Sequence, residues 1–185
     1  MTSPTITHLS VEPLTEESFR PFGQVIGESV AAPDFRGEQG TLGWSIDWRG
    51  GRAKISYLRT PYQGLRFRKL ERHLDLTQAF IPMGGAPAVV AVAAPTDLRD
   101  RDAVPGPDAV RAFLLDGSVG YALHKGTWHS LDRFAVTPPD TRWVIITDHE
   151  TADDLEAAYL GRGGFALSQE VDYAARSGTT FEIVL

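Results

Sequence analysis

Two short stretches of the chain gather residues that can bind metal ions or move protons. The first contains Glu71, His73 and Gln78. Residues two apart on a strand share a face, so we expect Glu71 and His73 to project together, with Gln78 reaching the same point from the next strand. The second stretch contains His124 and His129 on either side of a glycine turn. Because the sequence has no cysteine, a metal here would be held by histidine, carboxylate or amide groups and water.

The elements that must position these residues are predicted to be mainly short strands. The chain is cut by 18 glycines and 12 prolines into segments rich in β-branched and aromatic residues. Most neighbouring segments are too close for a crossover helix, so we expect antiparallel pairing. Because open sheet edges aggregate, the strands should close into a jelly-roll barrel or a sandwich. The expected strands are 24–30, 43–48, 54–59, 65–71, 77–82, 88–93, 110–115, 119–123, 127–134 and 143–147.

Signals for helices are few. Thr15 can cap a short helix that begins with Glu16 and Glu17 and ends before Pro21. A second helix is expected over residues 151–160. The prolines and aspartates between residues 95 and 108 predict a solvated loop.

The composition and the net charge limit the classes of protein to which the chain can belong. With 185 residues, 42% of them hydrophobic, the chain is expected to form a single domain over residues 1–185, with a flexible tail over residues 1–8. A net charge of −6 argues against nucleic acid and against an anionic membrane as partners. No apolar run reaches about 18 residues, and Pro4 and Pro13 interrupt the region where a signal peptide would lie. We therefore expect a soluble, cytoplasmic protein.

The spacing of the chemical residues resembles the two motifs of the cupin superfamily. The positions that match the first motif are Glu71, His73, Gln78 and Gly85, and those that match the second are Gly126 and His129. The resemblance implies a mainly β, cupin-type double-stranded β-helix with a few short helices, whose barrel holds a metal.

The match has departures. Glu71 stands where a histidine is usual, Gln78 where a glutamate is usual, His124 where a proline is usual, and Arg133 where an asparagine is usual. The resulting set of one carboxylate, two imidazoles and one amide suits a divalent ion such as Ni²⁺, Mn²⁺ or Fe²⁺.

A closer likeness is to ureidoglycolate lyases. It is carried by the blocks 11–19, 22–26, 70–73 and 77–83, and then by Tyr121, His124, Trp128 and His129. It covers about residues 9 to 148, whereas the C-terminal segment 149–185 diverges, with Asp148-His149-Glu150 where Asp-Arg-Gly is usual. The resemblance implies a homodimeric enzyme that splits ureidoglycolate into glyoxylate and urea during allantoin and purine degradation.

This resemblance implies a role for each candidate residue. Glu71, His73, Gln78 and His129 would hold the metal, and His124 would carry the proton, because an imidazole titrates near neutrality. Arg72 and Lys125 are the further catalytic candidates, because either could pair with the substrate carboxylate. Substrate binding is expected for Arg72, and for Trp128 and Phe80 as walls of the pocket.

Each residue also has a structural interpretation. Glu71 and His73 could form an exposed charged turn. The Gln78 amide could satisfy buried backbone groups, Trp128 could pack in the core, and His124 could be a surface histidine.

Three other functions stay open from the sequence. The same pocket could act on another small hydroxy or keto acid, because the C-terminal segment diverges. It could bind a small acid without turnover. An amidohydrolase would release ammonia in place of urea.

Overall fold

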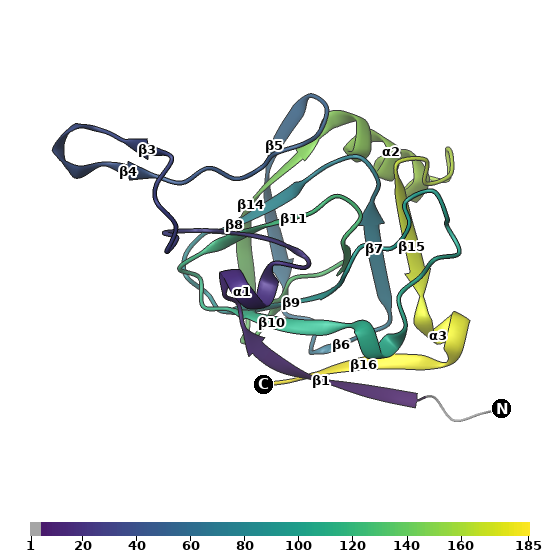
Figure 1. Ribbon diagram of the computed structural model, residues 1–185. Coiled ribbons are helices and arrows are strands. Elements are labelled where there is room, and N and C mark those ends of the chain that lie inside the picture. Colours follow the sequence, from purple (N-terminus) through teal and green to yellow (C-terminus); the bar gives the residue numbers. More distant parts are fainter. Residues whose placement is uncertain (1–4) are drawn as a thin grey trace.

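A computed structural model describes residues 5–185 of the chain (Figure 1). Two β-sheets face each other across a common interior, and the few helices lie at the ends of strands. This arrangement confirms the expected mainly β, cupin-type barrel with a few short helices. None of the helices within residues 5–185 is long and apolar enough to cross a membrane.

The smaller sheet has five antiparallel strands and forms one wall of the barrel. In spatial order they are β2 (Gly23–Ile26), β11 (Gly120–Leu123), β8 (Gln78–Pro82), β14 (Asp140–Asp148) and β5 (Ala53–Pro61). Gln78 pairs with Leu123, and Phe80 pairs with Tyr121. Since alternate residues share a face, Gln78 and Phe80 both face the interior.

The larger sheet has nine strands and forms the other wall. Eight of them follow one another as β15 (Ser168–Asp172), β7 (Lys69–His73), β12 (Trp128–Ser130), β9 (Ala88–Ala93), β10 (Arg111–Leu115), β1 (Thr5–Pro13), β16 (Thr179–Val184) and β6 (Arg66–Phe67), while β13 (Phe134–Ala135) also pairs with β9. His129 on β12 lies directly opposite Glu71 on β7.

Both ends of the chain join the larger sheet, which corrects two expectations. Residues 5–8, expected to be part of a flexible tail, belong to β1 and pair with β16 from Thr5 opposite Thr179 onward; residues 1–4 lie outside the described residues. β1 pairs in parallel with both β10 and β16, so the pairing is not antiparallel throughout. Because each partner lies about a hundred residues or more along the chain, local spacing gave no sign of this pairing.

The helices are short and capped by polar side chains. Thr15 caps α1 (Glu16–Phe19), as expected, and the structure adds a capping box with Ser18. Asp148 caps α2 (His149–Tyr159), so this helix begins two residues before the predicted start. A third helix, α3 (Tyr173–Ser177), was not expected. Two 3₁₀ turns occur, η1 (Glu38–Gly40) and η2 (Pro107–Ala109), the second within the predicted loop.

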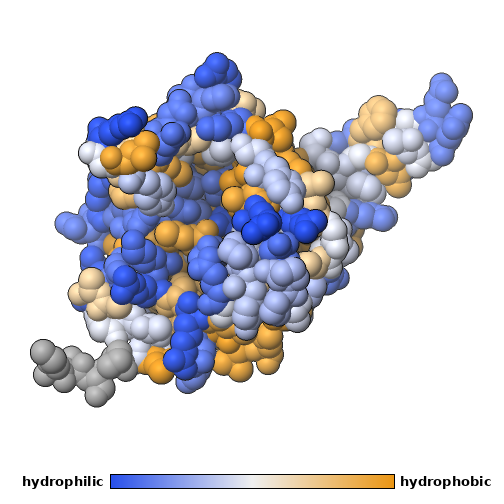
Figure 2. All heavy atoms as spheres, turned by 180° about the vertical axis from the view of Figure 1, so that it is seen from behind, coloured by the Kyte–Doolittle hydropathy of each residue, from blue (hydrophilic) through white to orange (hydrophobic). Residues whose placement is uncertain are grey.

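A hairpin arm projects from the body. It consists of β3 (Phe35–Arg36) and β4 (Leu42–Gly43) and stands away from both sheets (Figures 1 and 2). The expected strand 43–48 is therefore mostly irregular backbone leading from the arm to β5.

The central strands of the larger sheet, such as β9 and β12, are buried on both faces. Between the two sheets, an aromatic cluster contains Phe80, Tyr121 and Trp143. On the opposite face of the larger sheet, a second cluster contains Leu70 and Trp128. Successive side chains of one strand thus point alternately into the cluster between the sheets and into the cluster on the opposite face. This alternation decides which side chains can meet inside the barrel.

Candidate active site

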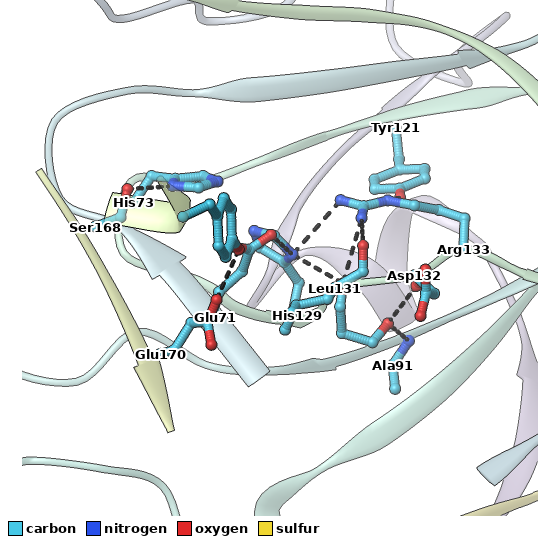
Figure 3. Close-up of polar contacts among 12 residues, drawn as sticks. Glu71, His73, Ala91, Tyr121, His129, Leu131, Asp132, Arg133, Ser168 and Glu170 are labelled. Carbon is cyan, nitrogen blue, oxygen red and sulfur yellow. Dashed lines mark hydrogen bonds and ion pairs between the residues drawn. The ribbon is translucent and has the colours of Figure 1, made fainter. Parts of the chain in front are cut away.

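Three polar side chains that the sequence analysis singled out meet inside the barrel. Glu71 and His73 share the inner face of β7, and His129 faces them from β12 (Figure 3). They can each place one ligand atom within 4.8 Å of the others, and all three are buried. The two imidazole rings are 5.2 Å apart between centroids. These residues could hold a metal ion.

The hydrogen bonds of both histidines use one ring nitrogen and leave the other without a partner among the described residues. His129 Nδ1 is 3.1 Å from the carbonyl oxygen of Ser130, which only accepts, so Nδ1 carries the proton. His73 Nδ1 is 3.0 Å from the hydroxyl of Ser168. The Nε2 atoms of both rings are buried and have no hydrogen-bond partner among residues 5–185. A ring held through one nitrogen with the other unsatisfied is the usual arrangement of a metal-binding histidine.

Gln78 joins this group from the smaller sheet. Its side chain is buried, and its Oε1 is a further buried atom without a hydrogen-bond partner among the described residues. The Gln78 amide also acts on His73, where it partly offsets the lowering of the pKa. Unsatisfied buried acceptors are costly, so an amide oxygen beside two unsatisfied imidazole nitrogens fits an absent cation better than a purely structural role.

The electrostatics favour ligand-ready histidines. Burial lowers the pKa of His73 to about 4, and burial also lowers the pKa of His129 well below its ordinary value, with the Arg133 charge adding to both effects. Burial raises the pKa of Glu71 to about 7, against the opposing effect of Arg133. At neutral pH the imidazoles are therefore neutral, and Glu71 can lose its proton to a bound cation.

Arg133 follows β12 and lies beside His129. Its guanidinium carbon is 3.7 Å from the centroid of the Phe80 ring, and its Nε donates to the Tyr121 hydroxyl at 3.0 Å. The residue itself is only 3% exposed. The inner end of the polar cluster is thus a buried cation packed against aromatic side chains, and Figure 3 shows Arg133 next to Tyr121 and His129.

The divergent C-terminal segment forms one wall of the site. In β15, Ser168 pairs with His73 and Glu170 pairs with Glu71, so both new residues share the face of the cluster. Glu170 accepts from Tyr159 of α2 at 2.6 Å and from Lys69 at 3.0 Å. A segment that departs from the family pattern therefore supports a candidate ligand directly.

Two expected substrate contacts are at odds with the structure. Arg72 lies between Glu71 and His73 and so points to the opposite face of β7, where its guanidinium stacks 4.6 Å from the Trp128 ring centroid. Trp128 belongs to the core cluster behind the larger sheet. Because side chains alternate along a strand, neither residue reaches the barrel interior. We therefore correct their assignment as substrate-binding residues, and with it the catalytic role of Arg72.

The remaining expected residues lie at the rim or in the interior. His124 is in the loop whose Gly126 amide donates to the His73 carbonyl, and its own Nε2 donates to the Arg20 carbonyl at 3.2 Å. Lys125 is half-exposed and forms an ion pair with Asp75 at 2.6 Å. Phe80 lies inside the barrel. Catalytic roles for His124 and Lys125, and a wall role for Phe80, stay predictions.

Sequence reasoning gave no role to four residues that the fold brings to the site. Ser168 and Glu170 come from a strand about a hundred residues away from β7, and Tyr159 comes from the helix before it. No local pattern marks such partners. For Arg133 a signal existed, because an arginine stands where the cupin motif has an asparagine.

Comparisons with known proteins give one consistent family. Residues 6–166 match the sequence model of ureidoglycolate lyase. The chain is 38% identical over 130 residues to a ureidoglycolate lyase of Pseudomonas aeruginosa, covering 65% of this chain and 73% of that protein. Similar proteins of the same name occur in Burkholderia mallei, at 37% identity and 65% and 72% coverage, and in Azotobacter vinelandii, at 34% identity and 65% and 74% coverage.

Among solved structures, the chain is similar to a mutant of the 3,4-ketoisomerase QdtA from Thermoanaerobacterium thermosaccharolyticum, in complex with TDP-4-keto-6-deoxyglucose. The TM-score is 0.36 at 15% identity, over 69% of this chain and 78% of that one. A likeness at this level carries no argument about the site. The family match spans most of the chain and includes both strands that carry the cluster, so the chain belongs to the ureidoglycolate lyase family.

Proposed function

We propose that the protein is a ureidoglycolate lyase that cleaves ureidoglycolate into glyoxylate and urea. The observation that supports this most directly is the buried cluster of Glu71, His73 and His129, which lies within the region that matches the family. Cleavage requires loss of the hydroxyl proton and protonation of the departing ureido nitrogen. A polar cluster inside an otherwise apolar barrel provides a place where both changes can be controlled.

The proposal includes a divalent ion, Ni²⁺, Mn²⁺ or Fe²⁺, held by Glu71, His73, Gln78 and His129. The unsatisfied Nε2 and Oε1 atoms support this donor set. Such an ion supplies Lewis acidity that lowers the pKa of the substrate hydroxyl. The protein residues prepare the site: the Ser130 carbonyl and the Ser168 hydroxyl hold the two imidazole rings, and the aromatic cluster around Phe80 excludes water from the inner end.

His124 is the proposed proton carrier between the hydroxyl and the departing nitrogen. It lies on the loop at the rim whose Gly126 amide donates to the His73 carbonyl, and its ring Nε2 donates to the Arg20 carbonyl. Replacement of His124 by Gln should lower the rate of urea release by about 100-fold, while binding of the divalent ion is unchanged. An unaltered rate would assign proton transfer to another group.

The test of the function is a product assay with racemic ureidoglycolate that follows glyoxylate and urea separately. It is run with chelator and with added Mn²⁺ or Ni²⁺, on the wild type and on His73→Ala. Equal release of both products by the wild type, and loss of release in the variant, support the lyase. Ammonia in place of urea indicates an amidohydrolase. A folded, ion-loaded protein that releases neither product argues for another small acid or for binding alone.

A homodimer is part of the proposal, with a second copy of this chain as the partner. The arm exposes Phe35, which is 60% accessible, on a hairpin that stands away from its own core (Figure 2). The edge strand β5 of the same chain exposes Ile55, which is 71% accessible, and Tyr57. An apolar arm and an apolar sheet edge on one molecule fit reciprocal packing between two copies.

Light scattering after gel filtration tests the dimer. We expect a mass twice that of the chain, and a monomer for Phe35→Asp. The exposed replacement Glu38→Lys, on the same arm but without apolar surface, should leave the dimer intact. A monomeric wild type would contradict the dimer without affecting the lyase proposal.

A further inference from the structure

Arg133 is held rigidly inside the barrel by neutral groups. Its Nη1 donates to the carbonyl oxygens of Leu131 at 2.7 Å and Ser130 at 3.3 Å, and its Nε donates to the Tyr121 hydroxyl. The Phe80 ring lies against the guanidinium plane. Two of the three nitrogens are therefore fixed, and the position of the third follows from the planarity of the group.

The third nitrogen has no acceptor among the described residues. Nη2 is 3.5 Å from His129 Nδ1 (Figure 3). That ring nitrogen already donates to the Ser130 carbonyl at the shorter distance of 3.1 Å, so it carries a proton and cannot accept a second bond. A charged donor is thus directed toward the polar cluster with nothing in residues 5–185 to receive it.

The charge of Arg133 is also unpaired. No carboxylate of residues 5–185 forms an ion pair with it, although it is almost fully buried. Burying a cation without an anion is costly, and folded proteins rarely do so without a functional reason. The groups around it are the ligand candidates Glu71, His73 and His129, on each of which its charge acts.

The other cations expected to bind a carboxylate are already occupied. The Arg72 donors go to Gln169, to Thr96 and to the carbonyls of Asp97 and Asp100. Lys125 is paired with Asp75 at the surface. Arg133 is therefore the cation in the described barrel interior that has an unused donor.

We propose that Arg133 is the residue that binds the substrate carboxylate, through Nη2, and that it makes the site selective for small acids with an ionised carboxylate next to a hydroxyl-bearing carbon. The proposal rests on the proposed function and deepens it, because ureidoglycolate is such an acid. An anion at this position would supply both the missing acceptor and the missing negative charge.

The test compares two ligands that differ only in charge at the relevant group, glycolate and glycolamide. Neither carries a ureido group, so neither can be cleaved to urea. Binding is measured by calorimetry on the full chain, both after treatment with chelator and with added Mn²⁺, to separate binding by the ion from binding by the arginine. We expect the wild type to bind glycolate about 10- to 100-fold more tightly than glycolamide under both conditions.

Two variants test whether Arg133 is the source of the preference for glycolate over glycolamide. Arg133→Gln should remove it, and Arg133→Lys should keep part of it, since a lysine retains the charge but not the planar fork. The matched control is Arg68→Gln, which removes a positive charge from an exposed position between β6 and β7, where Arg68 pairs with Asp172 at 3.3 Å. The control should bind like the wild type.

Each outcome is decisive. The proposal is overturned if the wild type shows no preference, or if a folded Arg133→Gln variant retains it. If Arg133→Gln does not fold, ¹⁵N NMR of the arginine side chains replaces it, with the signal assigned through Arg133→Lys. A shift of the Arg133 signal with glycolate but not with glycolamide supports the proposal, and no shift with bound glycolate overturns it.

The same experiments separate this proposal from the proposed function. A chain that releases no urea or glyoxylate, yet shows the preference dependent on Arg133, loses the lyase assignment and keeps the carboxylate site. A chain whose Arg133→Gln variant cleaves ureidoglycolate with an unchanged KM keeps the lyase assignment and loses the carboxylate site.

Discussion

The two faces of strand β7 are buried alike but satisfy their polar groups differently. On the outer face, Arg72 has every donor nitrogen engaged and its guanidinium stacked on Trp128. On the inner face, His73 keeps an unsatisfied nitrogen and Glu71 carries a raised pKa. Only one residue step separates these two situations.

The difference shows how stability and chemistry are divided between the faces. The fully satisfied buried cation of Arg72 anchors β7 to the loop 96–100 and to the neighbouring strand β15. Polar groups without hydrogen-bond partners contribute no such stability. They are retained where a bound ligand supplies the missing partners. We therefore expect replacements on the inner face to affect activity and ion binding, and replacements on the outer face to affect the free energy of unfolding.

The largest effect is expected for His129→Ala on the inner face. Losing one imidazole from the cluster should reduce the release of glyoxylate by at least about 1000-fold, which corresponds to about 4 kcal/mol in activation free energy. Bound Mn²⁺ or Ni²⁺, measured by elemental analysis, should fall in parallel. The adjacent outer-face variant Trp128→Phe should keep its activity. An equal loss of activity in both variants would contradict the assignment of activity to the inner face alone.

Arg72→Met should mainly lower stability. The variant leaves the Gln169 amide and several backbone carbonyls without donors, so the free energy of unfolding should fall by about 3 kcal/mol. Urea unfolding followed by fluorescence measures this loss. The folded fraction should retain wild-type activity per bound ion, whereas an inactive but stable variant would place Arg72 in the chemistry after all.

The charge state of Glu71 makes stability depend on pH in the metal-free protein. Its folded-state pKa of about 7 lies above the ordinary value of 4.5, so its contribution is fully present below about pH 4.5 and is lost as the pH rises through about 7. Glu71→Gln has no such loss. Its stability relative to the wild type should therefore rise by about 1–3 kcal/mol between pH 4.5 and 7.5.

Urea unfolding of chelator-treated protein at several pH values measures this difference. The opposite contribution of His73, whose pKa is lowered to about 4, is present in both proteins and does not alter its sign. Parallel pH curves for wild type and variant would show that Glu71 is not a protonated buried acid.

The smallest effect is expected for Ser168→Ala. The hydroxyl orients the His73 ring without touching the substrate, so ion affinity and activity should each fall by about 10-fold. Isothermal titration with Mn²⁺ measures the affinity. Ser177→Ala serves as a control on the same C-terminal segment, because its hydroxyl bonds to the Tyr173 carbonyl away from the site. Equal losses in both would indicate a general weakening of the segment.

Much of the inner face was predictable from the sequence. The alternation of residues around Glu71 and His73, and the short spacing to the next strand, predicted their convergence with Gln78. The helix N-cap at Thr15 and the loop over residues 95–108 were predicted from local signals that act within a few residues. The prediction for the outer face was wrong. Because side chains alternate along β7, Arg72 must point away from the site if Glu71 and His73 point into it.

The mainly β class, the turns, and the residue types that could form a metal site were predictable, because these depend on periodicity and on chemistry within short segments. The tertiary structure alone decided that β1 pairs in parallel, that β15 brings Ser168 to His73, and that Arg133 lies unpaired beside His129. These features arise from contacts between distant segments and from burial. Their energies depend on packing and local dielectric, which no short stretch of sequence encodes.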